Sequence, residues 1–369
     1  MHWPQPHEQP SAHPTRLCSN ALAAASRTAF CTPHTIVRRE RNMDSCTSLL
    51  ISFALCAFVF GRGAVGGGKE GLSYGFYKTT CPKVEQIVKE QVYKTYYIHG
   101  NSAISFHRNV FHDCSVEGCD ASLMLESTAD FRSEKESERN FGMRNFKYLN
   151  DIKDVLENEC PGVVSCADLV VLSGRDGVAI LGGPHFEVKT GRRDTRVRTT
   201  DKDADAYLLP HDAGVDAFLD TMAKLGINAP QAIALIGSHT VGRVHCVHLV
   251  SRLYPTVDPT LNASYAEYLK MRCPSPNPDP TALEYSRNDR GTPMIFDNNY
   301  YKNVIELKGL LRLDNALFLD PRTKPYVMRM AQDRDYFNEQ FIAGMAILTE
   351  HNVLTGSEGE IRKNCQWVN

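Results

Sequence analysis

An arginine and a histidine stand four residues apart in the segment RNVFHDC, which runs from Arg108 to Cys114. A helix is predicted over Ser102–His112, so the side chains of Arg108 and His112 project from the same helix face. A cation and an imidazole on a buried face are costly unless they serve a purpose, because both lose their contact with water. Taken alone, such a pair is more often a capped surface than a catalytic site, and both interpretations stay open at this point.

A second candidate histidine lies in GSHTVG, residues Gly237 to Gly242, directly after the apolar run AIALI. A lone histidine after an apolar helix is usually a core residue with satisfied hydrogen bonds. Histidine is also the usual axial ligand of a haem iron at which oxygen chemistry takes place. The segment therefore indicates either a core position or a cofactor ligand.

An acidic segment, DCSVEGCDAS, follows the first histidine over residues 113–122. Its oxygen-bearing side chains are those of Asp113, Asp120 and Ser122. Hard oxygen ligands in a tight loop that contains Gly118 are what Ca²⁺ requires, although the spacing is not that of an EF-hand. The alternative is an ordinary acidic turn held by a disulfide between its two cysteines.

A second acidic segment, NDRGTPMIFDNNYY, covers residues 288–301. Asp289, Thr292 and Asp297 again offer oxygens at short intervals, as a Ca²⁺ site needs. Asp297 could instead cap the N-terminus of a helix, and the two roles are compatible.

The elements that must position these segments are predicted to be mostly helices. Helices are expected over Val84–Tyr97, Ser102–His112, Phe146–Glu159, Cys166–Leu181, Val215–Leu225, Pro230–Ile236 and Tyr336–Thr349. Strand signals are scarce and short, as at Phe186–Lys189. Connections rich in Pro, Asp or Asn are expected around Thr199–Asp212 and Cys273–Pro280. The pattern predicts an all-α architecture with long irregular loops.

The first 70 residues differ in character from the rest of the chain. Leu49–Phe60 is apolar except for Ser52. The run is too short to span a bilayer but is typical of the apolar region of a secretory signal. A buried core helix is the alternative. We expect residues 1–70 to be an N-terminal extension and signal that is removed, with Met43 as the true start, and residues 71–369 to form the mature domain. No later apolar run is long enough to cross a membrane.

The charge and cysteine content of residues 71–369 agree with an exported, globular protein. They hold 34 Lys/Arg and 39 Asp/Glu and form no basic stripe, which disfavours nucleic-acid binding. The eight cysteines after the leader are Cys81, Cys114, Cys119, Cys160, Cys166, Cys246, Cys273 and Cys365. An even number in a chain with a secretory signal predicts disulfides, but the count does not choose the pairing. Zinc is disfavoured because no CxxC pair occurs.

In this order and spacing, these segments resemble one family, the class III secretory plant peroxidases, from about Leu72 to Asn369. The matching blocks are FYKTTCP (Phe76–Pro82), FHDC (Phe111–Cys114), GCDASLML (Gly118–Leu125), VSCADLV (Val164–Val170), GRRD (Gly191–Asp194), GSHTVGRVHC (Gly237–Cys246), TPMIFDNNYY (Thr292–Tyr301) and LTGSEGEIRKNC (Leu354–Cys365). The resemblance implies the haem peroxidase fold, with roughly ten or more helices. Haem is then held between a distal half, about 71–210, and a proximal half, about 211–350, and the C-terminal tail is pinned by Cys365.

The resemblance also implies the roles of the residues on the two sides of the haem. His239 is the expected ligand of the haem iron, and Asp314, in GLLRLDNALF, is the expected acceptor for its other ring N–H.

On the distal side, His112 is the expected general base and Arg108 the cation that stabilises charge during O–O cleavage. Asn140 is expected to accept a hydrogen bond from the far nitrogen of His112, and Glu134 to continue that chain. Pro210, in YLLPHD, matches the proline that orients donors.

Two Ca²⁺ sites, four disulfides and one glycosylation site are implied in the same way. The distal Ca²⁺ ligands are Asp113, Val116 O, Gly118 O, Asp120 and Ser122, and the proximal ligands are Thr240, Asp289, Thr292, Ile295 O and Asp297. The disulfides are Cys81–Cys160, Cys114–Cys119, Cys166–Cys365 and Cys246–Cys273. The sequon at Asn262 permits N-glycosylation.

The resemblance thus implies a peroxidase with one haem b and two Ca²⁺ per chain. It would reduce hydrogen peroxide to water while oxidising phenolic or other small aromatic donors in two one-electron steps. We expect a monomer secreted to the cell wall or apoplast, with a role in wall phenolic metabolism and the response to oxidative stress. The alternative is a haem-free cell-wall binding glycoprotein on the same fold. A metal-dependent hydrolase is disfavoured because no HExxH-like ligand cluster occurs.

Overall fold

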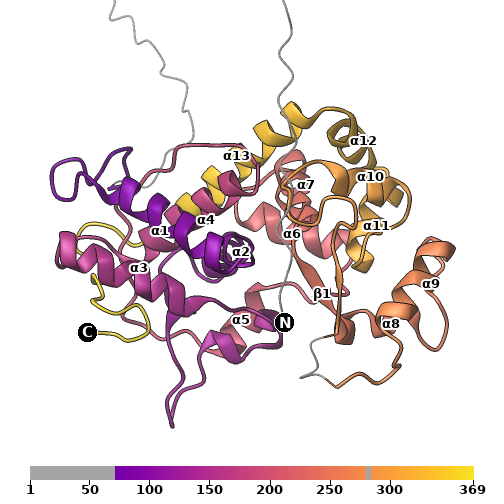
Figure 1. Ribbon diagram of the computed structural model, residues 1–369, viewed down its shortest axis with the longest axis horizontal. Coiled ribbons are helices and arrows are strands. Elements are labelled where there is room, and N and C mark those ends of the chain that lie inside the picture. The colour runs from indigo at the N-terminus through magenta and orange to yellow at the C-terminus, as the bar shows by residue number, and fades with distance from the viewer. Residues whose placement is uncertain (1–70, 280–283) are drawn as a thin grey trace, which may run out of the picture. The chain divides into compact units, whose positions relative to one another are not determined.

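The structure is a computed structural model that describes residues 71–279 and 284–369 (Figure 1). Within them the α-helices are α1 (Val84–Ile98), α2 (Ser102–Cys114), α3 (Phe146–Glu159), α4 (Cys166–Ile180), α5 (Asp201–Tyr207), α6 (Val215–Lys224), α7 (Ala229–Ile236), α8 (Val250–Leu253), α9 (Ala263–Arg272), α10 (Asn299–Ile305), α11 (Arg312–Leu319), α12 (Lys324–Gln332) and α13 (Arg334–Glu350). Short 3₁₀ turns are η1 (Ser122–Met124), η2 (Glu134–Glu136), η3 (Glu138–Asn140), η4 (Gly237–Thr240) and η5 (Cys246–His248). The strands are β1 (Arg243–His245) and β2 (Tyr285–Arg287). The predicted all-α architecture is confirmed.

Helix α2 packs closely along α4, since small residues on α4 let the two backbones approach (Figure 1). Ala103, Phe106 and Val110 recur every three or four residues on α2 and are fully buried. A Cβ added at Gly174 would lie 2.2 Å from Val110 Cγ2, and one added at Gly177 would lie 2.7 Å from the carbonyl oxygen of Ala103. This contact fixes the orientation of α2 and of the arginine and histidine that it carries.

Helix α7 leads directly into the turn that carries the second candidate histidine. A reciprocal cap begins the helix: Asn228 Oδ1 accepts from Gln231 N at 3.1 Å, and Gln231 Oε1 accepts from Asn228 N at 3.1 Å. The helix packs on α13, where a Cβ at Gly344 would already lie 3.0 Å from Leu235 Cγ. Turn η4 continues the chain from Gly237 to Thr240, so the packing of α7 sets the position of that turn.

The small sheet lies in two segments for which no strand was predicted, and the predicted strand is wrong. Strands β1 and β2 pair antiparallel, with Arg243 opposite Arg287 and His245 opposite Tyr285. No strand forms over Phe186–Lys189, which the structure leaves in irregular conformation. A strand needs a hydrogen-bonded neighbour, and a local pattern cannot supply that partner.

Helix α5 lies within the segment that was predicted to be a connection, Thr199–Asp212. Its first turn is closed by a capping box in which Asp203 N donates to Thr200 Oγ1 at 3.3 Å and Thr200 N donates to Asp203 Oδ2 at 2.7 Å. The acidic residues that indicated a loop instead cap a short helix. The connection Cys273–Pro280 is irregular as far as Asp279, and Pro280 lies outside the described residues.

Four disulfides join the eight cysteines of the described chain. They are Cys81–Cys160, Cys114–Cys119, Cys166–Cys365 and Cys246–Cys273, the pairs that the resemblance implies.

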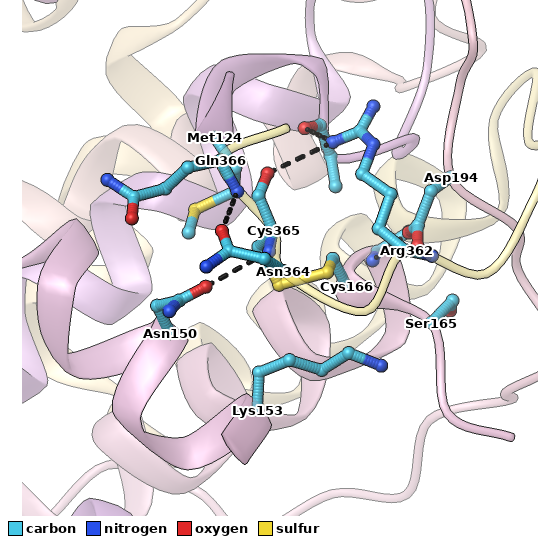
Figure 2. The surroundings of a disulfide bond; sticks show 12 residues. Met124, Asn150, Lys153, Ser165, Cys166, Asp194, Arg362, Asn364, Cys365 and Gln366 are labelled. Carbon is cyan, nitrogen blue, oxygen red and sulfur yellow. Dashed lines mark hydrogen bonds between the residues drawn. A yellow bond between two sulfur atoms is a disulfide. The ribbon is translucent and has the colours of Figure 1, made fainter. Parts of the chain in front are cut away.

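Figure 2 shows how the third of these disulfides holds the C-terminal tail to the start of α4. Beside it, the backbone N–H of Cys365 donates to Asn150 Oδ1 at 3.0 Å, and that of Arg362 donates to Asp194 Oδ2 at 2.8 Å. The side chain of Arg362 is fully buried and donates to Ala121 O at 2.8 Å. The tail therefore belongs to the core.

The predicted secretory signal, including Leu49–Phe60, lies in residues 1–70, outside the described residues. Among the helices of residues 71–279 and 284–369, none is both long enough and apolar enough to cross a bilayer.

Candidate active site

A cavity of about 340 Å³ lies between α2 and η4 and brings together residues from both halves of the chain. Of the residues predicted to be functional, Arg108, His112, Pro210 and His239 line it. The predicted partners of the two histidines lie behind them and do not reach the cavity. The arrangement gives two histidines, carried by different elements, access to one enclosed space.

His112 is held in one tautomer by two hydrogen bonds. Its Nδ1 lies 2.7 Å from Asn140 Oδ1, and because an amide oxygen only accepts, Nδ1 carries the proton. Its Nε2 accepts from Arg108 Nε at 3.0 Å, which agrees with a lone pair on that nitrogen. Burial, and after it the charge of Arg108, lower the pKa of His112 to about 3. The imidazole is therefore neutral over the physiological range and able to accept a proton.

The hydrogen-bond chain behind His112 continues through a backbone atom. Asn140 Nδ2 donates to the carbonyl oxygen of Glu134 at 2.7 Å, which fixes the orientation of the amide. The carboxylate of Glu134 accepts instead from Thr199 Oγ1. Glu134 thus joins the chain through its backbone carbonyl and not through its acid group.

His239 on η4 has a carboxylate partner where His112 has an amide. Its Nδ1 lies 3.0 Å from Asp314 Oδ1, which also accepts from Tyr300 OH at 3.0 Å. Asp314 Oδ2 accepts from the backbone N–H of Leu311 at 2.7 Å. Burial by itself raises the pKa of Asp314, but His239 and these donors hold the pKa below its ordinary value. Asp314 is therefore ionised, and no hydrogen bond within the described chain engages His239 Nε2, which is the ring nitrogen free to bind a ligand.

Comparison with known proteins agrees with this geometry. The profile of the family described as Peroxidase matches residues 84–333. Peroxidase 21 of Arabidopsis thaliana is 53% identical over 322 residues, which cover 87% of this chain and 98% of the relative. Peroxidase 42 of the same plant is 52% identical over 306 residues, covering 83% and 92%. The cationic peroxidase SPC4 of Sorghum bicolor is 40% identical over 298 residues, covering 80% and 81%.

The chain belongs to the peroxidase family. Its resemblance to the class III plant peroxidases and its prediction as a peroxidase enzyme are thereby confirmed. The mostly helical structure is that of the haem peroxidases, as the sequence predicted. No observation favours the haem-free alternative.

The first acidic segment of the peroxidase folds into a tight loop around buried carboxylates. Asp113 is fully buried and accepts from the backbone N–H groups of Ala121 at 3.1 Å and Leu123 at 3.3 Å. Burial raises the pKa of Asp113, and the nearby Asp120 and Glu134 raise it further. Buried carboxylates that repel one another in this way form a donor set suited to a hard cation. Val116, Gly118 and Ser122 belong to the same loop, and their predicted ligand atoms add further oxygens.

The second acidic segment is joined to η4 by a network of oxygen atoms. Thr240 Oγ1, next to His239, donates to Asp297 Oδ1 at 3.0 Å. Thr292 Oγ1 donates to Asp289 Oδ2 at 3.0 Å. Asn299 Nδ2 connects the two pairs, at 2.9 Å from Thr292 Oγ1 and 3.2 Å from Asp297 Oδ2.

Four of the five predicted proximal calcium ligands are therefore gathered in one network. Ile295 follows in the same turn, since its backbone N–H donates to Thr292 O at 3.0 Å. The predicted cap at Asp297 is also present in part, because Asp297 Oδ1 accepts from the backbone N–H of Asn299 at 2.9 Å, at the start of α10.

The predicted glycosylation site caps a helix. Asn262 Oδ1 accepts from Tyr265 N at 3.2 Å at the start of α9 and from Ser264 Oγ at 2.8 Å. Its Nδ2, the atom that would carry a glycan, donates to Glu306 O at 3.3 Å.

Several residues of the cavity were not predicted from the sequence. The lining contains four arginines, Arg108, Arg139, Arg144 and Arg243, but a single carboxylate, that of Glu138. It also contains His211, His245 and His248. Arg243 and His245 lie within the block GSHTVGRVHC, and His211 lies within YLLPHD, but neither motif assigned these residues a role. Only the folded chain brings them to one cavity.

Proposed function

We propose that this peroxidase binds one haem b in the cavity between α2 and η4 and uses hydrogen peroxide to oxidise phenolic or other small aromatic donors. Each peroxide would be reduced to water as two donors lose one electron each. The observation that carries this proposal is the pair His112 and His239. One has its cavity-facing nitrogen prepared as a base, and the other has a carboxylate behind it and a ring nitrogen free to bind a metal.

The chemistry of the cavity fits haem. An imidazole with an ionised carboxylate behind it is a suitable axial ligand, because the carboxylate makes the ring nitrogen a stronger electron donor. Haem also carries two carboxylates, and none of the four lining arginines forms an ion pair with a carboxylate of the described chain. Arg144 and Arg243, which lie close enough for Arg243 to lower the pKa of Arg144, would hold those carboxylates. Haem would supply the redox chemistry at its iron.

The distal residues would move the proton of the peroxide. His112 Nε2 accepts a proton from one peroxide oxygen and returns it to the other, so a single nitrogen serves as base and then as acid. Arg108 now occupies that nitrogen with its Nε, so peroxide must replace this hydrogen bond on binding. Arg108 then stabilises the negative charge that develops as the O–O bond breaks. Burial lowers the pKa of Arg108 to about 10, which still leaves it charged at neutral pH.

Calcium would act through the backbone on both sides of the cavity. We expect the distal ion to be held by the 113–122 loop and the proximal ion by the network of Thr240, Asp289, Thr292 and Asp297. Asp113 directly follows His112, and Thr240 directly follows His239. Each ion would therefore fix the position of one histidine that faces the cavity.

The cellular setting proposed is the cell wall or apoplast, with the enzyme acting as a monomer. The predicted secretory signal and the four disulfides support export, because disulfides persist in oxidising compartments. Wall phenolic metabolism and the response to oxidative stress follow from this setting. Pro210 lines the cavity, in agreement with a role in orienting donors.

The test is the absorption spectrum of the purified mature protein before and after one equivalent of hydrogen peroxide. A Soret band that weakens and shifts with peroxide and recovers on adding guaiacol is the expected result. Absence of a Soret band after refolding with haemin and Ca²⁺ would refute the proposal and favour the haem-free binding protein.

The variant His112→Ala separates the role of the base from haem binding. It should retain the Soret band, yet react with peroxide more slowly by roughly two to four orders of magnitude, the usual contribution of a positioned general base. Peroxide kinetics close to those of the native enzyme would remove His112 from the mechanism.

A further inference from the structure

The rim of the cavity carries a group of residues that the peroxide reaction does not use. Five residues form this rim cluster: Arg139, Phe141, Pro210, His211 and His248. They come from three separate segments: η3 with the residue that follows it, the connection between α5 and α6, and η5. His211 is exposed and the other four are half-buried, so the cluster lies between the cavity and solvent.

The rings of the rim cluster form a continuous aromatic surface. The Phe141 ring meets His248 edge to face, with centroids 5.2 Å apart. The His248 and His211 rings are tilted by 46°, with centroids 5.0 Å apart. Pro210 immediately precedes His211. Burial lowers the pKa of His248 to about 4, so its ring is neutral at physiological pH and adds an aromatic face without adding charge. An aromatic donor would find favourable ring contacts at this surface.

The positive charge at the rim belongs to Arg139, and its guanidinium forms no ion pair with residues 71–279 or 284–369. Arg139 Nε is buried and makes no hydrogen bond in the part of the chain that the structure describes. No described carboxylate lies within ion-pair distance of its guanidinium. The exposed Glu138 is its sequence neighbour, but the two do not pair. Arg139 nevertheless lies near enough to His248 to lower the pKa of that histidine. A half-buried guanidinium with a buried, unbonded Nε beside an aromatic surface is suited to an anionic partner, because a carboxylate would supply the missing acceptor.

We infer that the rim cluster is a donor subsite for phenols that bear a carboxylate, an inference that rests on the proposed function. Arg139 determines the preference for these phenols by binding the carboxylate. The phenol ring lies against Phe141, His211 and His248, and the carboxylate pairs with the guanidinium of Arg139. The other arginines of the cavity that form no ion pair already have proposed roles. Arg108 is engaged with His112, and Arg144 lies beside Arg243, the pair assigned to the carboxylates of haem.

Three probes with the same phenol ring and different charge test this inference. They are 3-(4-hydroxyphenyl)propanoate, its neutral methyl ester, and the cation tyramine. Binding to the haem-loaded enzyme is measured without peroxide, from the change in the Soret band on titration. The kcat/KM of each donor is measured separately at saturating peroxide. The substitutions are Arg139→Gln and Arg139→Lys, with Arg198→Gln, at an exposed arginine outside the cavity lining, as the control. Because the Arg139 side chain forms no hydrogen bond or ion pair with the described residues, neither substitution at this position removes such a bond from the fold.

The native enzyme is expected to bind the propanoate roughly tenfold more tightly than the ester, as one charge-assisted hydrogen bond at a partly exposed site allows. Tyramine should bind least well. Arg139→Gln should remove the difference between acid and ester without changing binding of the ester, and Arg139→Lys should retain part of it. Salt should weaken the preference, because the pair is partly exposed.

Equal binding of acid and ester by the native enzyme would overturn the inference. So would a preference that survives Arg139→Gln, or one that Arg198→Gln also abolishes. If Arg139→Gln instead loses haem, its guanidinium holds the cofactor, and the donor subsite is likewise refuted. A normal Soret band and a normal peroxide reaction without charge preference would refute this inference alone, whereas the absence of a Soret band in the native protein would refute the proposed function.

Discussion

Removal of Ca²⁺ from the 113–122 loop should make the stability of the folded protein fall as pH rises. Without the ion, burial raises the pKa of Asp120 to about 6 and that of Glu134 to about 7, and it also raises the pKa of Asp113. The ordinary values are 3.8 for the aspartates and 4.5 for the glutamate. Between about pH 4 and pH 7 the unfolded chain therefore loses protons that the folded chain keeps.

The sign and size of the effect follow from these shifts. A carboxyl whose pKa is higher in the folded state contributes its full stability below the unfolded pKa and loses it as pH rises through the folded pKa. A shift of about two pKa units, as for Asp120, corresponds to a loss on the order of 3 kcal/mol by pH 7. A bound dication favours the ionised carboxylates, so the Ca²⁺-loaded protein should not show this loss.

The assay is the thermal midpoint of the haem-loaded protein from pH 5 to pH 8, with excess Ca²⁺ and after passage over a chelating resin. The thermal midpoint of the Ca²⁺-free protein should fall below that of the Ca²⁺-loaded protein, and this difference should grow by roughly 6 °C or more between pH 5 and pH 7. Asp120→Asn is the matched control, because it removes one titrating carboxyl and should both flatten the pH dependence of the Ca²⁺-free form and weaken Ca²⁺ binding. A Ca²⁺-free midpoint that stays level or rises over this range would show that these carboxylates do not form a cation site.

Three further perturbations address the residues around the cavity. Asp314→Asn removes the anion behind His239 and should raise the reduction potential of bound haem by at least about 60 mV, the one-electron equivalent of a tenfold change, as measured by spectroelectrochemistry. The rate constant for the peroxide reaction should be constant around neutral pH and fall only as pH drops through the pKa of His112, about 3. A stopped-flow pH profile that instead bends near pH 6.5 would contradict the conclusion that burial keeps His112 neutral. Ser238→Ala removes the only described hydrogen-bond partner of the buried His107 Nε2, at 2.8 Å, and should lower the free energy of unfolding by roughly 1–3 kcal/mol. Adding His107→Phe to that variant should restore most of the loss in a denaturant titration, because the apolar ring leaves no polar atom unpaired.

The parts of the fold and site that sequence predicted are those set by local spacing. Arg108 and His112 share a helix face because four residues make about one turn, and Phe146–Glu159 has the helical boundaries that its apolar period indicates. The roles of Asn140 and Asp314 came from the family resemblance. They lie 28 and 75 residues from the histidines that they contact, and no local pattern connects them.

The predictions from sequence were wrong where the structure depends on contacts between residues far apart in the chain, or where the local residue pattern is compatible with more than one structure. The sheet pairs Arg243–His245 with Tyr285–Arg287, and each strand is too short to show a period of its own. Thr200 and Asp203 indicated a loop by composition, yet the same residue types cap a helix when they stand three apart. The unpaired charge of Arg139 could not be predicted from the sequence, because it depends on which side chains lie beside the guanidinium in the folded chain.

The two histidines of the cavity owe their different roles to the groups behind them. Both use Nδ1 to hold their orientation and leave Nε2 for the cavity, but His112 donates to a neutral amide and His239 to an ionised carboxylate. An amide fixes the tautomer and favours the positive ring only weakly, so burial and Arg108 keep His112 neutral and able to take a proton. A carboxylate in the same place would favour the protonated ring and remove the base at neutral pH. Behind His239 the carboxylate instead gives the imidazole anionic character, which suits a metal ligand. Exchanging Asn140 and Asp314 would therefore be expected to impair both the proton transfer by His112 and the metal binding by His239, although each histidine would keep a hydrogen bond.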